Sequence, residues 1–464
     1  MKFTRRSLLQ AMGTTAAGAA VGCKPNPDPV VSAVERIDPT DAWEGRGTPD
    51  EEVFPLGVAS GDPTSESVLL WTRTTSSSEI TVEVAAWREE AWESVGSFPV
   101  EVVDGFVHHV VTELDADLPL AFQFKTAEDE FSRVGYSRTT LAADGRGVIR
   151  IGATSCASFQ NAPFPSMTQV AARGPLDVML WVGDQVYADG SNTVEDYREK
   201  WEAALDTEGF RSLLTACASL CTWDDHEVNN NWDPTILPEE LVANARQVFF
   251  EMSPLGNPEG TGQIWRSVRY GKTVEIFVLD CRGERNPDTG MYISSEQFQW
   301  LVDGVTQSEA VWKLIVNSVP ISNMPEAYDF ADLDLDRWEG YPVQRQALLD
   351  AISGVSGTFF VSGDFHHCTL AKVEPSGPSA KLLEFLVGPA GSNLNPLGGL
   401  LQDDVQFLWS SAAWCSSRID LSDDGTGKIE WIFDSGETFC SASFNVDGEV
   451  YDLEYVAPDG TEPV

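Results

Sequence analysis

The chain contains 464 residues, enough for roughly two to four domains with sizeable hydrophobic cores. Hydrophobic residues make up 42% and aromatic residues 10%, a composition that excludes a largely disordered chain. The 72 acidic residues outnumber the 30 basic ones, and the net charge of −42 would repel a phosphate backbone. We therefore expect no stable nucleic-acid binding. Two explanations of the acidity stay open: a well-solvated surface, or carboxylates that hold metal ions.

The first 23 residues have the features of an export signal. Arg5 and Arg6 precede an Ala/Gly-rich stretch that is too short and too weakly apolar to span a bilayer. The arginine pair resembles the twin-arginine signal, whose pathway carries folded proteins. Residues 20–23 resemble a bacterial lipobox in which Cys23 becomes lipidated, and cleavage after the small residues before it is the alternative. We expect the protein in the periplasm, lipid-anchored at the cell envelope, or secreted.

A proline- and glycine-rich stretch over residues 24–52 predicts a tether. Residues 53–145 then show apolar residues at every second position, as in Ile80 to Ala86 and Ala121 to Lys125. Turn residues separate these runs at the spacing of a small antiparallel sandwich. The pattern predicts an all-β domain of the immunoglobulin or fibronectin type.

Residues 146–464 have a different pattern, in which short apolar runs alternate with helical stretches. This alternation is typical of an α/β domain. The runs are Val148–Ala153, Val178–Val182, Leu220–Trp223, Val274–Leu279, Leu314–Val316 and Thr358–Val361.

Potential metal ligands follow several of these runs. Three of the five histidines fall in such segments, together with many carboxylates. Taken alone, each segment can be explained as an ordinary turn or helix cap without any function. Because the carboxyl ends of strands meet at one edge of an α/β sheet, the segments together predict one site. The segments are Thr154–Cys156, Gly183–Tyr187, Asp224–Glu227, Asp280–Arg282 and Gly363–His367.

The order of the motifs carries a family resemblance from about residue 54 to residue 390. The motifs are Gly57–Pro63 with Leu70–Arg73, Ala153–Cys156, Gly183–Asp189, Trp223–Trp232, Trp338–Pro342 and Ser362–His366. Together they resemble alkaline phosphatase D, the PhoD-like metallophosphatases. The resemblance implies a calcineurin-like, four-layer α/β/β/α catalytic domain after the N-terminal β-sandwich. Cys281, the additional His367 and residues 388–417 depart from the family pattern.

The residue types suit hydrolysis of phosphate esters, because clustered metal ions neutralise the ester and stabilise its leaving oxygen. Asp184 is placed to bridge two ions and to take part in catalysis, and Tyr187 lies one helical turn further on. Phenolate together with the Cys156 thiolate favours a ferric ion.

Oxygen ligands from Asp225 and from an asparagine of residues 229–231, which we take as Asn230, suit calcium. Asp364 and His366 would complete the ligand set. The resemblance implies Fe(3+) and Ca(2+), and the sequence alone does not fix the metals. We predict that His226 orients the phosphate and protonates the leaving group. The alternative is that it only supports Asp225.

Two functions follow from this interpretation. The first is an exported, metal-dependent phosphoesterase that acts on phosphate monoesters or diesters of small molecules or lipid headgroups. The second is a catalytically inactive, calcium-dependent surface-binding lipoprotein with the same fold. The complete set of candidate ligands favours the first, because a decayed site would lose members of a costly buried charge cluster. We expect a monomer with a possible membrane tether through Cys23.

Overall fold

The structure is a computed structural model that describes residues 36–257, 260–324, 336–401 and 405–456. The predicted export signal, Cys23 and the first part of the predicted tether lie outside the described residues. Within these ranges, no helix combines the length and the hydropathy needed to cross a bilayer.

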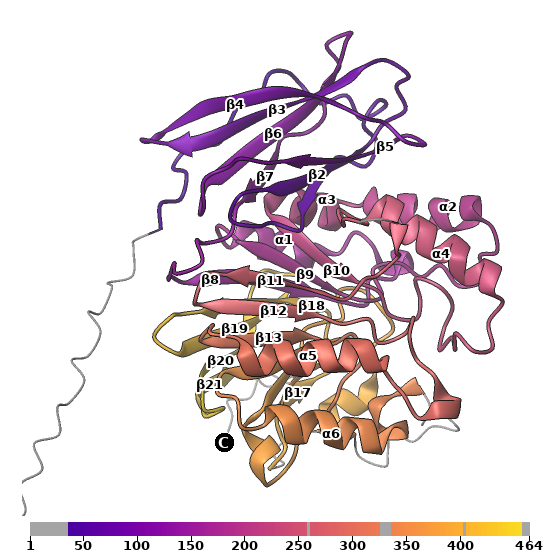
Figure 1. Ribbon diagram of the computed structural model, residues 1–464, viewed down its shortest axis with the longest axis vertical. Coiled ribbons are helices and arrows are strands. Elements are labelled where there is room, and N and C mark those ends of the chain that lie inside the picture. The colour runs from indigo at the N-terminus through magenta and orange to yellow at the C-terminus, as the bar shows by residue number, and fades with distance from the viewer. Residues whose placement is uncertain (1–35, 258–259, 325–335, 402–404, 457–464) are drawn as a thin grey trace, which may run out of the picture. The chain divides into compact units, whose positions relative to one another are not determined.

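A ten-stranded sheet forms the centre of the described chain (Figure 1). Its strands β8, β9 and β10 are parallel neighbours. Both faces of β9 and β10 are covered, which explains why their sequences are almost continuously apolar. In spatial order the strands are β21 (Val450–Tyr455), β20 (Thr438–Asn445), β19 (Thr426–Phe433), β18 (Cys415–Leu421), β8 (Ile149–Thr154), β9 (Val178–Val182), β10 (Ala218–Thr222), β1 (Val58–Gly61), β2 (Val68–Arg73) and β5 (Phe106–Val111).

A seven-stranded sheet packs against the ten-stranded sheet. Leu180 of β9 and Leu314 of β13 belong to one apolar cluster that contains residues of both sheets. Strands β12, β13, β14 and β16 are parallel, so their carboxyl ends lie at one edge. The spatial order is β11 (Arg266–Tyr270), β12 (Val274–Val278), β13 (Trp312–Val316), β14 (Thr358–Ser362), β16 (Leu383–Leu386), β15 (Cys368–Lys372) and β17 (Phe407–Ser411).

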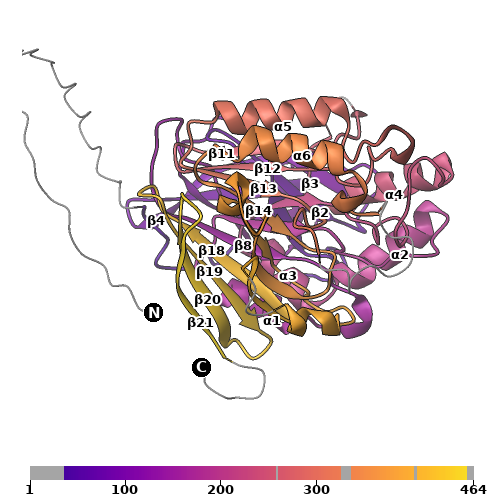
Figure 2. The same cartoon turned by 90° about the horizontal axis from the view of Figure 1, so that it is seen from below.

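Helices cover the outer faces of both sheets (Figures 1 and 2). Trp181 of β9 stacks on Phe210 of α3, and Phe277 of β12 belongs to a cluster with Leu301 of α5. The helices are α1 (Pro165–Ala172), α2 (Val194–Leu205), α3 (Glu208–Ala216) and α4 (Glu239–Met252) on the ten-stranded sheet, and α5 (Ser295–Gln307) and α6 (Pro342–Ile352) on the other. Short 3₁₀ turns are η1 (Phe159–Asn161), η3 (Pro287–Thr289), η6 (Trp338–Gly340), η7 (Pro378–Lys381) and η8 (Pro396–Leu400).

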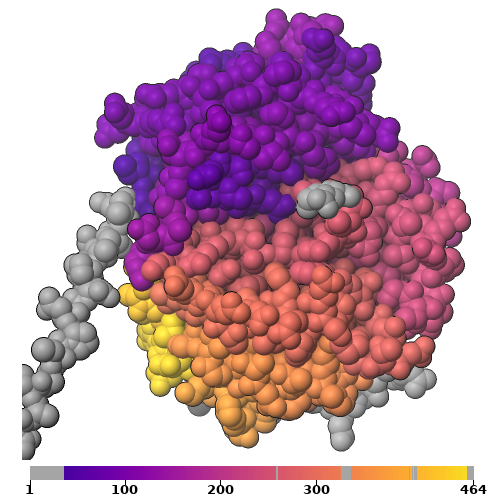
Figure 3. Space-filling view, in the orientation of Figure 1, coloured from indigo at the N-terminus to yellow at the C-terminus, as the bar shows by residue number. Residues whose placement is uncertain are grey.

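The N-terminal β-rich region has two strand layers around one core, and one of these layers is part of the ten-stranded sheet. A four-stranded sheet, β4 (Ala91–Val100), β3 (Ile80–Arg88), β6 (Pro119–Thr126) and β7 (Gly135–Arg138), shares an apolar cluster with β1, β2 and β5. The latter three strands, however, extend the ten-stranded sheet, because Ser60 of β1 pairs in parallel with Ala218 of β10. Strand patterning shows which residues form strands but not which sheet they join. Figure 3 shows the indigo and purple surface of the N-terminal region lying against the pink and salmon surface of later residues.

The described half of the predicted tether is held by ion pairs. Arg36 contacts Asp177 and Asp117, and its Nη1 lies 2.8 Å from Asp177 Oδ2. Asp177 is fully buried at the start of β9 and also pairs with Arg150. The two guanidinium groups outweigh the cost of burying the carboxylate and hold the pKa of Asp177 below its ordinary value. The chain is therefore anchored from Arg36 onward.

We predict that Asp177→Asn lowers the free energy of unfolding by about 3 kcal/mol at pH 7, because Arg36 and Arg150 each lose their fully buried counter-charge and keep only a more exposed one. Since the pKa of Asp177 is depressed in the folded state, this stabilisation is present above about pH 4 and is lost as the pH falls further. Urea unfolding at pH 7 and at lower pH measures both effects. An equal difference between wild type and variant at every pH would contradict the ionic role of Asp177.

Candidate metal centre

Four candidate ligands lie in tight turns directly after strands. Cys156, Asp184, Asp364 and His366 have φ angles of 55°, 54°, 63° and 54°. This left-handed conformation is uncommon for residues other than glycine, and strained residues of this kind gather at functional sites. The turns end β8, β9 and β14 and aim the four side chains at one edge of the two sheets.

Gly183 allows the Asp184 turn to approach a neighbouring strand end. Its φ is +78°, and a Cβ at this position would lie 2.5 Å from the Cβ of Asp224. A side chain here would push apart the turns that follow β9 and β10. The glycine of the Gly-Asp motif thus lets Asp184 and Asp224 come together.

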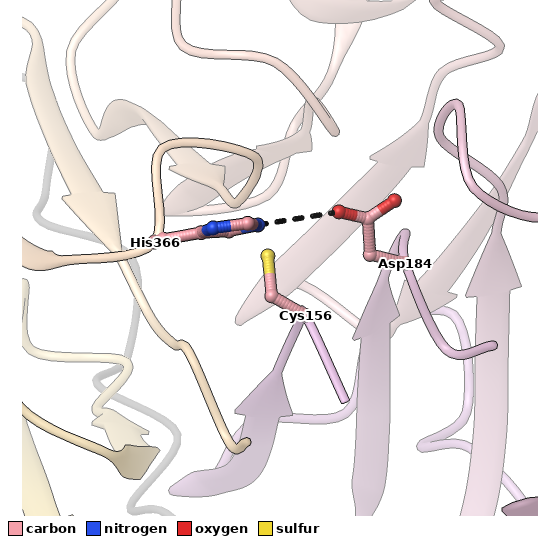
Figure 4. Close-up of side chains that lie close together, drawn as sticks. All are labelled: Cys156, Asp184 and His366. Carbon is pink, nitrogen blue, oxygen red and sulfur yellow. Dashed lines mark ion pairs between the residues drawn. The ribbon is translucent and has the colours of Figure 1, made fainter. Parts of the chain in front are cut away.

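Cys156, Asp184 and His366 form one group that can hold a metal ion (Figure 4). One atom from each lies within 4.8 Å of the others, and His366 Nε2 is 4.0 Å from Asp184 Oδ2. Tyr187 joins this group, because its hydroxyl lies 3.0 Å from His366 Nε2 and 3.4 Å from Asp184 Oδ2. Sulfur, nitrogen, phenolic and carboxylate donors therefore converge from both sheets.

Carboxylates form the adjoining groups. Asp224, Asp225 and Asp364 lie together, and a further group joins Asp184 and Asp225 with His226. Asp225 Oδ2 accepts a hydrogen bond of 2.6 Å from the backbone N–H of Asn231, but its buried Oδ1 has no hydrogen-bond partner. A buried carboxylate oxygen without a partner is costly unless a cation binds it. This observation fits a metal ion at Asp225.

The pKa values of Asp184, Cys156 and Tyr187 are all raised, which shows that simultaneous ionisation of these groups is unfavourable. Burial and the charges of Asp225 and Asp224 raise the pKa of Asp184 well above its ordinary value. Burial and Asp184 raise the pKa of both the Cys156 thiol and the Tyr187 phenol. A cation among these groups would reverse this balance and favour thiolate, phenolate and carboxylate.

Arg282 supplies a buried positive charge that the sequence analysis did not include among the site residues. Its guanidinium donates to both oxygens of Asp224 at 2.8 and 2.9 Å, and lies 3.5 Å from Asp364. It also pairs with Asp336. Asp224 is thus largely satisfied by Arg282, with a further bond of 2.7 Å from Ser318, whereas Asp225 is not. The sequence signal was the strand-end segment Asp280–Arg282, which contains Arg282 but does not reveal its acidic partners.

His226 is held by Asp189, another residue that the sequence analysis left out of the site. His226 Nδ1 donates to Asp189 Oδ2 at 2.6 Å, and the Tyr187 ring stacks on the imidazole with centroids 3.9 Å apart. Burial lowers the pKa of His226, but the hydrogen bond and charge of Asp189, together with the charges of Asp225 and Glu227, more than offset this, so the pKa is raised. The Gly183–Asp189 motif contained the signal, because it includes Asp189.

Glu227 fixes the two turns that carry the aspartates. Its carboxylate accepts backbone N–H bonds from Gln185 at 2.6 Å and from Asp224 at 2.9 Å. The side chain is fully buried, and burial raises the pKa of Glu227 to about 7. Glu227 acts by holding backbone, and it is not in any of the metal-binding groups identified among the described residues.

The structure brings together all but one of the residues predicted to form the site. Asn230 is the exception, because it is exposed and its backbone N–H donates to Asp189 Oδ1 at 2.6 Å. Its neighbour Asn231 is the residue that bonds Asp225, through the backbone. A ligand role for Asn230 remains a prediction.

Comparison with known proteins identifies the family. The sequence model of the PhoD-like phosphatase matches residues 151–407, and that of the PhoD-like phosphatase N-terminal domain matches residues 40–141. The chain belongs to the PhoD-like phosphatases. The resemblance noted in the sequence motifs is thereby confirmed.

Related proteins agree with this family. Alkaline phosphatase D from Bacillus subtilis (strain 168) is 26% identical over 432 residues, covering 78% of this chain and 71% of that protein. A solved structure of PhoD covers 90% of this chain and 95% of its own, with a TM-score of 0.77 and 22% identity. Purple acid phosphatase PPD1 from yellow lupin has a TM-score of 0.61 at 13% identity, covering 84% and 73%. These structures support a metallophosphatase-like fold.

We predict opposite effects of Asp184→Asn with and without metal. After chelation the variant should melt several degrees higher than wild type, because one charge of a repelling cluster is gone. Since the pKa of Asp184 is raised in the folded state, the advantage should grow as the pH rises through that pKa. Addition of metal should stabilise wild type only.

Scanning calorimetry over a pH series measures both parts of this prediction. The exposed Glu93→Gln serves as the control that removes one charge far from the site. An equal stabilisation by metal in Asp184→Asn and wild type would exclude Asp184 as a ligand.

Proposed function

We propose that this PhoD-like phosphatase is an exported, metal-dependent phosphoesterase that hydrolyses phosphate monoesters or diesters. The observation that carries the proposal is the buried carboxylate cluster beside Cys156, Tyr187 and His366, in which Asp225 Oδ1 has no partner. Such a cluster fits a polynuclear metal centre better than a structural ion-pair network, because Arg282 balances only part of its charge.

The donor types suggest how the ligands would divide. Cys156, Asp184, Tyr187 and His366 would hold a ferric ion, whereas the oxygens of Asp225 and Asp364 suit calcium. When bound, such ions would neutralise the ester phosphate and activate water as the nucleophile. Asp184 lies in the group with Cys156 and His366 and also in a group with Asp225, so it would stand between the two ions and is the candidate bridge.

His226 would transfer the proton to the leaving oxygen. Its Nδ1 is occupied by Asp189, which leaves Nε2 for the substrate. The Asp189 carboxylate favours the imidazolium form, and the stacked Tyr187 ring fixes the plane of the imidazole. This arrangement suits a general acid.

His226→Asn should lower kcat by about 100-fold or more while metal content stays unchanged, since a general acid contributes at least that factor. Asp189→Asn should lower the pKa of His226, so that activity is lost at a lower pH on the alkaline side of the profile. Assays with p-nitrophenyl phosphate and bis(p-nitrophenyl) phosphate, together with metal analysis, measure these effects. Loss of metal in His226→Asn would instead indicate a ligand or supporting role.

Tyr187 provides a test of the ferric assignment. If the phenolate binds Fe(III), the purified protein should be coloured by ligand-to-metal charge transfer, and Tyr187→Phe should shift or remove that band. Tyr292→Phe is the matched control, because Tyr292 is a buried tyrosine whose hydroxyl donates to the backbone of Asp336. A fully active, iron-free and colourless wild type would contradict a ferric ion and leave an all-divalent centre.

Substitutions in the predicted signal peptide test the proposed export route. Replacing Arg5 and Arg6 by lysines should block accumulation outside the cytoplasm, since the twin-arginine pathway requires the arginine pair. Fractionation with an antibody to the chain measures this, and Lys24→Arg is a control that alters a basic residue outside the signal. Unchanged export of the double variant would exclude this route.

A further inference from the structure

Two cysteines meet at the boundary between the central sheets. Cys368 begins β15 of the seven-stranded sheet, and Cys415 begins β18 of the ten-stranded sheet. Their Sγ atoms are 3.0 Å apart although 47 residues separate them in sequence. Both side chains are fully buried in the apolar cluster between the sheets.

Four of the other five cysteines of the described chain have different surroundings. Cys217 and Cys221 are four residues apart on one extended segment, so their Cα atoms are about 13 Å apart, too far for a disulfide. Cys281 is hydrogen-bonded to Asn317, and Cys156 belongs to the metal centre. Cys440, on β20, lies in the same cluster as Cys368 and Cys415 and is the one competing partner.

We propose that Cys368 and Cys415 close to a disulfide that crosslinks the two central sheets when the chain folds in the presence of a disulfide oxidant. A movement of about 1 Å would bring the sulfur atoms to bonding distance. The crosslink would be independent of the phosphoesterase activity proposed above.

The two cysteines would be oxidised by thiol–disulfide exchange with the oxidant. The thiolate of one cysteine attacks a sulfur of the oxidant, which forms a mixed disulfide and releases one thiol. The second cysteine then attacks the sulfur of the first and displaces the other thiol of the oxidant. Two protons and two electrons leave the pair, and one disulfide of the oxidant becomes two thiols.

Burial determines when this exchange can occur. Burial and the neighbouring Cys368 raise the pKa of Cys415 well above its ordinary value, so Cys415 stays a thiol once the core has closed. The oxidant must therefore reach the pair before β15 and β18 are covered. On an export route that carries folded chains, the pair would be a disulfide only if the core had closed in a compartment that contains such an oxidant. It would stay as two thiols if the core had closed in a reducing compartment.

The crosslink would also restrict the movement of two turns of the candidate metal centre relative to each other. Cys368 follows His366 by two residues, and the backbone N–H of Cys415 donates to Pro389 O at 2.8 Å. The adjoining Gly391 N–H donates to Cys156 O at 3.1 Å. A covalent bond here would tie the His366 turn of one sheet to the Cys156 turn of the other.

Synthesis of the full chain in a cell-free system with a glutathione redox buffer tests the proposal, because the thiols then meet the oxidant before the core closes. After alkylation in denaturant, we expect two of the eight cysteines to be protected and a peptide linking Cys368 to Cys415 in the mass spectrum. Cys440→Ala should keep the link, whereas Cys415→Ala should leave Cys368 open to alkylation.

Thermal unfolding gives a second readout on the wild-type chain. The oxidised protein should melt roughly 5 °C higher than the same sample after reduction, since the bond closes a loop of 47 residues. Alkylation of both Cys368 and Cys415 in the glutathione-treated chain would overturn the proposal. A link from either one to Cys440 would overturn it equally.

Discussion

The repulsion among buried carboxylates is the constraint that shapes the site. Asp184, Asp224, Asp225 and Asp364 stand at one edge of two sheets, and Arg282 neutralises mainly Asp224. Such a cluster is unfavourable in an apolar interior unless cations complete it. Burial of the two large apolar layers offsets part of the free-energy cost of bringing these carboxylates together. Binding of the proposed metal ions would offset the remainder. Stability and function should therefore be linked through metal occupancy.

The turns at the strand ends position the candidate ligands, and the stability of the packed strands makes these turns possible. Left-handed residues at Cys156, Asp184, Asp364 and His366 cost conformational energy that the packed strands β8, β9 and β14 offset. Glu227 adds fixed hydrogen bonds to the turns after β9 and β10. These backbone contacts fix the turns that carry the candidate ligands, which would reduce the reorganisation that metal binding requires.

Local pattern was enough to predict much of this arrangement. The apolar runs at Val178–Val182 and Thr358–Val361 are β9 and β14, and the residues that follow them do converge. Individual residue pairs between distant segments could not be predicted, because periodicity carries no information on partners. Asp189 beside His226, Arg282 against Asp336, and Cys368 beside Cys415 are all of this kind. The joining of β1 to β10 was missed for the same reason.

The parallel pairing of β1 with β10 has a consequence for attempts to shorten the protein. A chain that began after residue 145 would lack β1, β2 and β5, and β10 would become an edge strand with unpaired backbone N–H and C=O groups. Cys221 of β10, which belongs to the same apolar cluster as Ala59 of β1 and Leu69 of β2, would lie beside that open edge. Such a fragment should self-associate by adding strands from neighbouring molecules, so the N-terminal region also serves as protection against aggregation.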